Sequence, residues 1–485
     1  MRRLAALLAL AALLGAASCR EEPRGAVKVV VIGGAPQLRD PAVAGLSPPD
    51  EVLLANAAQG LVGFDASGNI VGGLAERWTV SDDGLSYIFR IASASWPDGK
   101  PITAEQVAHA LKRAIAARSK DSLKDQFAAV EDIVAMTDRV IEISLTAPRP
   151  DLLALLAQPQ MAILRGGEGT GPFRLAAAAD GTFRLTRDIV SPDDETTSRE
   201  QLLLGGAPAD VAIREFAAEK IDLVLGGTFA NLPLTARAKL PGDSLHFDPA
   251  SGLFGLIPTQ SGGPLDKPEV RQLLSAAIDR DAFVAALGVP GLAPRATLLE
   301  PGLDGVPAPA PPAWAATAHA DRSAGLQAQA KRLFGKTPMP PIWLQLPDGP
   351  GADLLFNLLK RDWGALGFTV ERTDSRATAD FALIDEVAPS TSPAWFVRRF
   401  RCDLVPVCDR NADGLVDGAR ETPVLAQRYA LLGQAAALID SGHLFLPIAA
   451  PVRWSLVSGR IQNFAGNRYA RHTLTDLEAK PSTGE

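Results

Sequence analysis

Several residue types that often carry catalysis or metal binding are scarce in this 485-residue sequence. It has three cysteines, three tyrosines and five histidines, and aromatic residues make up only 6% of it. The histidines are scattered, and neither an HExxH nor a GxSxG motif is present, so neither a zinc pair nor a nucleophile with its base is indicated. We therefore expect no enzyme activity and no cofactor. The few aromatic residues also offer little stacking surface for a sugar.

Positive charge is scarce as well. Lys and Arg number 48 against 55 Asp and Glu, the net charge is -7, and no basic block is visible. Nucleic-acid binding draws on concentrated Lys and Arg, so we do not expect a nucleic-acid partner. The remaining composition is ordinary for a folded protein, with 47% hydrophobic and 21% charged residues. The length allows about three domains.

The apolar run at the N-terminus is shorter than the about 20 residues that a bilayer span requires. Two arginines precede the apolar residues 4–17, as in a secretory signal peptide. The run ends in AASC, which resembles the lipobox of bacterial lipoproteins. This resemblance implies a signal peptide at residues 1–18, a lipid on Cys19 and a tether at residues 19–25. Ordinary cleavage nearby, with Cys19 incidental, is the alternative.

The other two cysteines, Cys402 and Cys408, lie close together in the segment RCDLVPVCDR. In an oxidising, exported setting such a pair favours a local disulfide over a metal site, because zinc needs further Cys or His ligands and none is nearby. Free thiols in a mobile loop are the alternative. We predict the disulfide.

The next segment, DRNADGLVD, has part of the pattern of an EF-hand calcium loop. The oxygen-bearing positions are Asp409, Asn411, Asp413 and Asp417. Arg420 stands where a bidentate Glu is needed. We therefore expect no metal site, with calcium as a weak alternative, and we expect these polar residues to open a helix.

Residues 85–115 predict a strand, a rigid turn and a helix. The stretch LSYIFRI alternates as a half-buried strand does. The following WPDGKP stops strand pairing, because its prolines lack donors and its Asp-Gly favours a tight turn. Thr103 and Gln106 then form a capping box that starts the helix.

A βαβ unit is expected between residues 341 and 385. The stretches PIWLQLP, FTVER and DFALI are typical of strands, and DLLFNLLKRDWGAL between the first two is typical of a helix. The Pro- and Ala-rich residues 301–325 predict a surface connection. This alternation of strands and helices indicates an α/β fold.

Segments over most of the chain resemble, in order, the signature regions of the family 5 solute-binding proteins of ABC importers, which include oligopeptide, dipeptide and nickel binders. The matching segments are LVGFDASGNIVGGLAERW, SWPDGKPITAEQV, GTGPFRL, KPEVRQLLSAAIDR, RDWGALGFTVE and QRYALLGQAAALIDSGHLFLPI. On this resemblance, the rigid turn at Trp96 belongs to the scaffold.

The resemblance implies a bilobal periplasmic-binding-protein fold of type II, with the extra small domain of the peptide-binding group. Domain I would be discontinuous, at residues 26–55, 168–258 and 450–485. Domain II would cover residues 56–167 and domain III residues 259–449. Two crossovers between the lobes would form a hinge, and the ligand would lie in the closing cleft.

The function implied by the resemblance is capture of a solute, a peptide or peptide-like by default, and its delivery to the permease subunits of an ABC importer. We expect a monomer, held by its lipid at the membrane on the periplasmic or cell-surface side. A chaperone or sensor on the same fold is the alternative, and an exported enzyme is a weaker one. Nickel and haem are not expected, because the histidines are dispersed.

The ligand site departs from that of the peptide binders in this family. Their W..DY.DP segment carries an Asp that meets the ammonium group of the ligand, whereas DFALIDEVAPSTSPAWF has Pro389 at that place. The nearest carboxylates are Asp385 and Glu386, with Trp395 as an apolar wall. This implies a ligand with a basic or hydrogen-bond-donating group. The alternative is that both acids end a strand in solvent.

Overall fold

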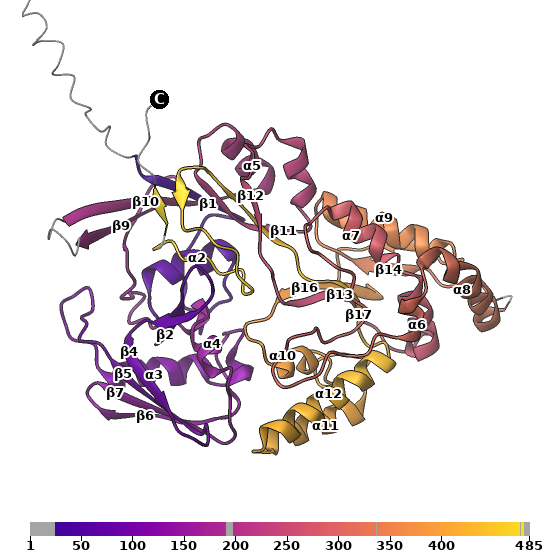
Figure 1. The fold of residues 1–485 in the computed structure, drawn as a ribbon, viewed down its shortest axis with the longest axis horizontal. Coiled ribbons are helices and arrows are strands. Elements are labelled where there is room, and N and C mark those ends of the chain that lie inside the picture. The colour runs from indigo at the N-terminus through magenta and orange to yellow at the C-terminus, as the bar shows by residue number, and fades with distance from the viewer. Residues whose placement is uncertain (1–24, 191–196, 336, 476, 480–485) are drawn as a thin grey trace, which may run out of the picture.

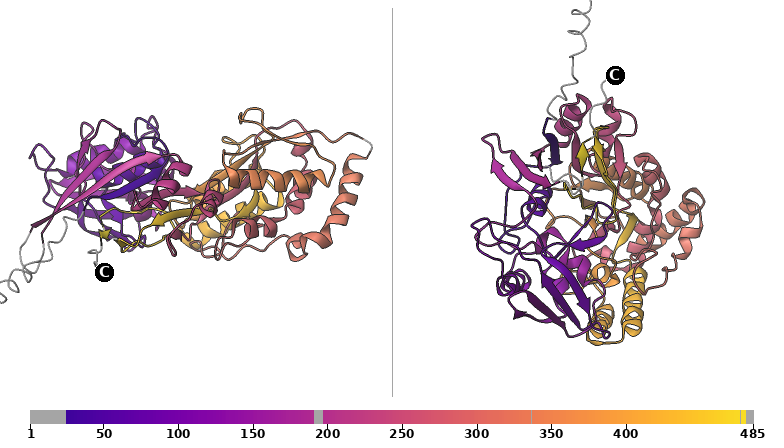
Figure 2. Two further views of the ribbon diagram at one scale, coloured as in Figure 1. Left: turned by 90° about the horizontal axis from the view of Figure 1, so that it is seen from above. Right: turned by 60° about the vertical axis from the view of Figure 1, so that its left-hand side comes forward.

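The protein has two lobes that lie end to end (Figures 1 and 2). The structure is a computed structural model that describes residues 25–190, 197–335, 337–475 and 477–479. The first lobe, coloured mainly indigo to magenta, contains two larger sheets, and the second lobe, mainly orange, contains one (Figure 1).

A mixed seven-stranded sheet of order β12-β18-β11-β1-β10-β9-β8 forms the body of the first lobe. Its central strand β1 runs parallel to β10 and β11, and the outer pairs are antiparallel. Val27, Val29 and Val31 of β1 alternate into a core that they share with Leu53 of the helix α2. The bounds are β1 Val27–Ile32, α2 Pro48–Ala57, β8 Arg174–Ala177, β9 Phe183–Val190, β10 Thr197–Ala207, α5 Ala209–Ala217, β11 Leu223–Thr228, β12 Leu245–Phe247 and β18 Arg453–Val457.

The small subdomain, which we define as β2 to α4, completes the first lobe. Its antiparallel sheet has the order β4-β5-β7-β6, and α3 packs against β6 and β7. The bounds are β2 Val62–Phe64, β3 Ile70–Gly72, β4 Ala75–Val80, β5 Ser86–Ile91, α3 Ala104–Ile115, β6 Val130–Thr137, β7 Val140–Leu145 and α4 Leu152–Leu156. The sheet and its helix enclose a hydrophobic core of their own.

The predicted strand, turn and helix of this subdomain are confirmed. Thr103 and Gln106 form the capping box of α3. The side chain of Trp96 is buried, and its Nε1 donates a hydrogen bond to Oε1 of Gln106 at 2.8 Å. The turn therefore ties the start of α3 to the core, which is a structural role.

The second lobe has a five-stranded sheet between two layers of helices. The order is β15-β14-β16-β13-β17, and the predicted βαβ unit is confirmed, because β14 and β15 are parallel and α9 connects them. Phe254 and Leu256 of β13 face the layer with α6, α7 and α9, whereas Leu253 and Ile257 face α10, α11 and α12. The bounds are β13 Gly252–Pro258, α6 Pro268–Ala277, α7 Arg280–Leu287, α8 His319–Phe334, β14 Ile342–Gln345, α9 Pro350–Gly364, β15 Val370–Arg372, β16 Phe381–Val387, α10 Pro393–Arg398, α11 Arg410–Glu421, α12 Leu425–Ser441 and β17 Leu446–Ala449.

Two short segments connect the seven-stranded and five-stranded sheets, residues 248–251 and residues 450–452. The N–H of Asp248, in the first segment, donates at 3.0 Å to the carbonyl of Arg453, the residue directly after the second segment. Two crossovers were predicted, but the first one lies before β13, not after it. The strand β13, assigned from sequence to domain I, pairs with β16 and β17 of the second lobe. Its run GLFGLIP is buried throughout, so its pattern fits the interior of either sheet.

The predicted surface connection at residues 301–325 ends earlier than expected. Helix α8 begins at His319 and buries Leu326 and Ala330. Alanine favours helices, so the Ala-rich end of the segment continues into a helix instead of a loop.

Candidate ligand-binding site

A cavity of about 650 Å³ lies between the lobes, at the end of β16. The first lobe contributes residues 228–230, which end and follow β11, and the second lobe contributes β16, the end of β14 and the loop after α10. Apolar lining comes from Phe229, Ile257, Leu383, Leu404 and Val405. The polar lining includes both acids that the sequence pointed to.

Asp385 lies at this cavity but is already bound by a cation. Nη1 of Arg453 lies 2.8 Å from Oδ1 of Asp385, and Nη2 donates to the backbone carbonyl of Asp385 at 3.0 Å. Arg453 is on β18 of the first lobe, so this ion pair joins the lobes beside the second crossover. Burial raises the pKa of Asp385, and Arg453 opposes that rise. Asp385 therefore stabilises the contact between the lobes.

Glu386, the second predicted acid, forms an ion pair with Arg399. Both side chains keep contact with solvent, at 45% exposure for Glu386 and 38% for Arg399, although Nε of Arg399 is buried. Burial lowers the pKa of Arg399, and the nearby Arg376 lowers it further. The cavity wall thus carries two guanidinium groups beside the Glu386 carboxylate.

Trp395, the predicted apolar wall, is not among the residues that line this cavity. It is 5% exposed and packs edge to face against Phe396 in the core of the second lobe. The guanidinium of Arg399 lies over its ring at 5.5 Å. Trp395 therefore supports Arg399 from behind, and the lining residues supply the apolar wall.

A second polar zone lies where the small subdomain meets the second lobe around Pro389. The hydrogen bonds across this boundary include those from Gln158 Nε2 to the Pro389 carbonyl at 2.9 Å, from Ser390 Oγ to Asp151 Oδ2 at 3.1 Å, from Arg428 Nη1 to the Pro148 carbonyl at 2.8 Å, and from Arg398 Nη1 to the Asp125 carbonyl. Burial raises the pKa of Asp151, whereas Arg149 and the Ser390 hydroxyl lower it. The lobes are therefore in direct contact at Pro389.

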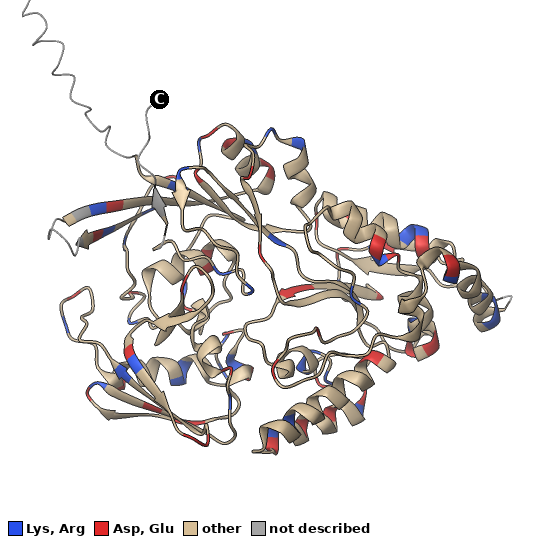
Figure 3. Ribbon diagram, in the orientation of Figure 1, with Lys and Arg blue, Asp and Glu red and all other residues tan. Residues whose placement is uncertain are grey.

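Four further charged residues at these sites, Arg149, Asp151, Arg376 and Arg399, were not predicted from the sequence. The signal for the first two is the segment PRPD, in which two prolines hold an Arg and an Asp on a stiff connection between a strand and a helix. No local pattern marks Arg376 or Arg399. Charged positions of both signs are spread over both lobes (Figure 3), so charge alone does not find the site.

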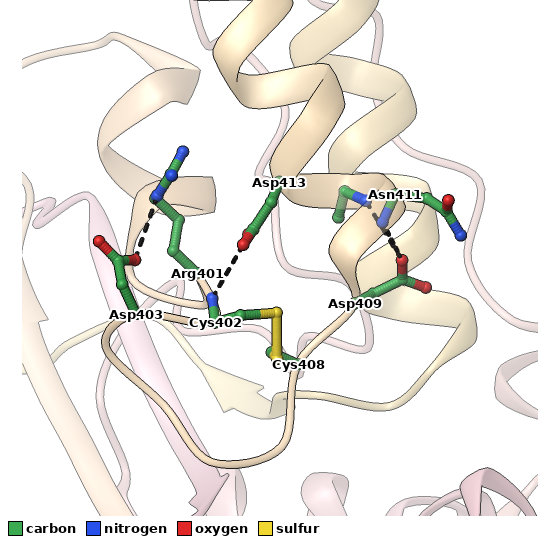
Figure 4. Close-up of a disulfide and its surroundings, with 8 residues drawn as sticks. Arg401, Cys402, Asp403, Cys408, Asp409, Asn411 and Asp413 are labelled. Atoms are coloured by element: carbon green, nitrogen blue, oxygen red, sulfur yellow. Dashed lines mark hydrogen bonds and ion pairs between the residues drawn. A yellow bond between two sulfur atoms is a disulfide. The ribbon is translucent and has the colours of Figure 1, made fainter.

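The structure contains a disulfide between Cys402 and Cys408, whose Cα atoms are 5.1 Å apart (Figure 4). It closes the loop between α10 and α11, directly before the start of α11. Leu404 and Val405 within this loop line the cavity. The disulfide therefore constrains one wall of the cavity.

The residues of the calcium alternative serve other purposes here. Asp409 is the N-cap of α11 and accepts from the N–H groups of Asn411 and Ala412. Asp413 accepts from the N–H of Cys402 at 3.1 Å (Figure 4), and Asp417 pairs with Arg401 at 2.7 Å. Asp409, Asp413 and Asp417 are spaced four residues apart, so they extend over about 12 Å along the helix. Each carboxylate is bound by a different partner, so these oxygens do not ring one point. Among the described residues, no cluster of three or more His, Cys, Asp or Glu is placed to hold a metal.

The N-terminal predictions, including lipidation of Cys19, fall outside the described residues. Within the described residues, no helix combines the length and the apolar character that a membrane crossing needs.

Comparison with known proteins places this architecture in a family. The family model described as "Bacterial extracellular solute-binding proteins, family 5 Middle" matches residues 69–387. The chain belongs to the family 5 bacterial extracellular solute-binding proteins. One curated relative, "Probable di/tripeptide-binding protein 5" of Pseudomonas aeruginosa, is 23% identical, covering 87% of this chain and 89% of that protein. Another, "Di/tripeptide-binding protein 1" of the same organism, is 23% identical and covers 94% and 96%.

Solved structures share this fold. OppA of Burkholderia pseudomallei has a TM-score of 0.78 at 18% identity, and OppA of Haemophilus influenzae in complex with RPPGFSPFR has 0.77 at 17%. Each likeness covers 94% of this chain and 100% of the other. The predicted family and the bilobal α/β fold are confirmed. The named family 5 relatives are binding proteins, which points away from catalysis.

Proposed function

We propose that this protein captures a peptide or peptide-like solute between its lobes and delivers it to the permease of an ABC importer. The observation that carries the proposal is the interlobe cavity, which combines apolar walls with convergent charged groups, as small-molecule sites do. The names of the di/tripeptide-binding relatives support the choice of solute. A lipid on Cys19 would hold the protein at the membrane.

Within the cavity we assign the ligand-contacting acid to Glu386. Asp385 is paired with Arg453. Glu386 pairs with Arg399, which is partly exposed and can move away. A basic or hydrogen-bond-donating group of the solute would replace Arg399 at the carboxylate. The exchange keeps the carboxylate paired, which a closing and partly dry cleft requires.

The test is titration of the purified protein with a set of di- and tripeptides, for Glu386→Gln and Asp385→Asn separately. Loss of a charge-assisted contact costs about 1.5 to 3 kcal/mol, so we expect Glu386→Gln to weaken binding by roughly ten- to a hundredfold. The control is Asp374→Asn, at an exposed acid in the loop that carries Arg376. If both acid variants bind within about twofold of the parent, neither acid anchors the ligand.

A further inference from the structure

Arg149 is a buried cation without a bonded partner. It lies on the connection between β7 and α4, and its residue is 8% exposed. Among the described residues, its guanidinium has no hydrogen bond and no ion pair, and its Nε is fully covered. Prolines on both sides restrict its backbone. Buried charged groups are normally paired, so this arrangement is energetically costly as it stands.

The surroundings of Arg149 come from both lobes. Burial is the main cause that lowers the pKa of Arg149, and Arg398 and Arg420 of the second lobe add charge repulsion. Asp151 and Tyr429 raise the pKa of Arg149. However, no carboxylate oxygen of a described residue lies within ion-pair distance of the Arg149 guanidinium. Arg420 pairs with Asp417 and Arg398 donates to the carbonyl of Asp125, whereas Arg149 has no such partner among the described residues.

The boundary is held together on both sides of Arg149. Arg428 donates to the carbonyl of Pro148, the residue before it, and Ser390 donates to Asp151, two residues after it. These two bonds place the Arg149 loop against the second lobe with little freedom to shift. An anion that reached this point would meet a preorganised guanidinium and would cost little reorganisation.

We propose that Arg149 binds a carboxylate group of the solute at the boundary between the small subdomain and the second lobe. This subsite is separate from the Glu386 cavity, because Arg149 is not among the residues that line that cavity. A planar carboxylate matches the fork of a guanidinium in a two-point contact. A phosphate dianion fits less well, because the buried Asp151 would repel its second charge. The inference rests on the proposed solute-binding function and adds the chemical class of one ligand group.

The test compares di- and tripeptides that have a free C-terminal carboxylate with the same peptides as C-terminal amides. We expect the free acids to bind the parent protein at least about tenfold more tightly than the amides, because only the acids pair with Arg149. Arg149→Gln should bring the acids down to the affinity of the amides, and Arg149→Lys should keep part of the difference. The control is Arg428→Gln, which removes a closing contact at the same boundary and should weaken acids and amides by the same factor.

Each remaining outcome is also decisive. Acids and amides that bind the parent within about twofold of each other would overturn the role of Arg149 while leaving peptide capture intact. Phosphate binding that Arg149→Gln abolishes, without discrimination between acid and amide, would overturn the carboxylate assignment. If no peptide binds the parent, the proposed solute class fails. Mass spectrometry of the molecules released from the purified parent and from Arg149→Gln then tests the carboxylate subsite. A carboxylate compound carried by the parent and absent from Arg149→Gln supports the subsite, whereas identical compounds in both overturn it.

Discussion

Replacing Arg453 with methionine should destabilise the protein by about 3 to 5 kcal/mol, because the change removes the cation from a buried carboxylate. The two side chains are only 16% and 15% exposed, so water cannot take over the role of Arg453. Arg453→Met would lose the ion pair at 2.8 Å and two bonds to backbone carbonyls, those of Asp385 and Val452. Methionine keeps much of the apolar length of the side chain, so lost packing contributes little.

The loss should depend on pH in a defined direction. Burial already raises the pKa of Asp385, and removal of Arg453 takes away the group that opposes this rise. The unfolded pKa of an Asp is about 3.9. When the folded pKa is higher, the acid contributes stability that is fully present below the unfolded pKa, and this stability is lost as the pH rises through the folded pKa. The gap between Arg453→Met and the parent should therefore be largest above neutral pH and smallest near about pH 4.

Urea unfolding followed by tryptophan fluorescence measures this gap. Trp454 is buried next to Arg453 in the sequence and donates to the carbonyl of Thr228, so it reports on this region. Adding Asp385→Asn to Arg453→Met should recover part of the lost stability, because the amide carries no charge to bury. Arg199→Met, at an exposed ion pair, is the control and should cost less than about 1 kcal/mol. The reasoning would be refuted if Arg453→Met lost less than about 1 kcal/mol both above neutral pH and near about pH 4. It would also be refuted if Asp385→Asn restored no stability to Arg453→Met.

Three further predictions concern the anchor, the disulfide and a buried acid. Cys19→Ala should move the protein from the membrane fraction to the soluble fraction of cells, because the lipid anchor is lost; unchanged fractionation contradicts it. Cys402→Ser should lower the free energy of unfolding by about 2 kcal/mol through loss of loop closure, and non-reducing peptide mapping of the parent that finds Cys408 free would contradict the bond. Burial raises the pKa of Asp440 to about 7, while a hydrogen bond from the N–H of Leu298 opposes this. The parent should therefore lose stability as the pH rises from about 4 through 7, by roughly 2 to 4 kcal/mol, and Asp440→Asn should flatten this profile in urea unfolding.

The elements that the sequence predicted well are those that local interactions determine. Thr103 and Gln106 are three residues apart, and the strand before them is recognisable from its own alternation, so both were predictable without tertiary information. The same holds for the polar start of α11, where Asp409 caps its own helix. The family resemblance then supplied the order of the elements, which local patterns do not contain.

The site was less predictable because its contacts join distant parts of the chain. Arg453 and Asp385 are 68 positions apart, and Gln158 and Pro389 are 231 apart. Asp385 lines the cavity, and its pairing with Arg453 depends on how β18 lies beside the end of β16. The buried position of Trp395 was unpredictable for a similar reason, since an aromatic residue near a binding segment can face either the cavity or the core behind it.

The contacts between the lobes differ in what a hinge motion would do to them. Arg453 directly follows the crossover at residues 450–452, so its bond to Asp385 lies near the axis and can persist while the lobes rotate. The bonds at Pro389 and Pro148 lie on the opposing surfaces of the small subdomain and the second lobe, and an opening that separates these surfaces must break them. A solute stabilises the closed form only by the contacts that it makes in that form and not in the open one. A solute carboxylate on Arg149 would add such a contact, because residues of the second lobe are bonded to its neighbours Pro148 and Asp151. Arg149→Gln should therefore reduce the ability of the solute to close the lobes, whereas Arg453→Met should reduce stability with or without solute.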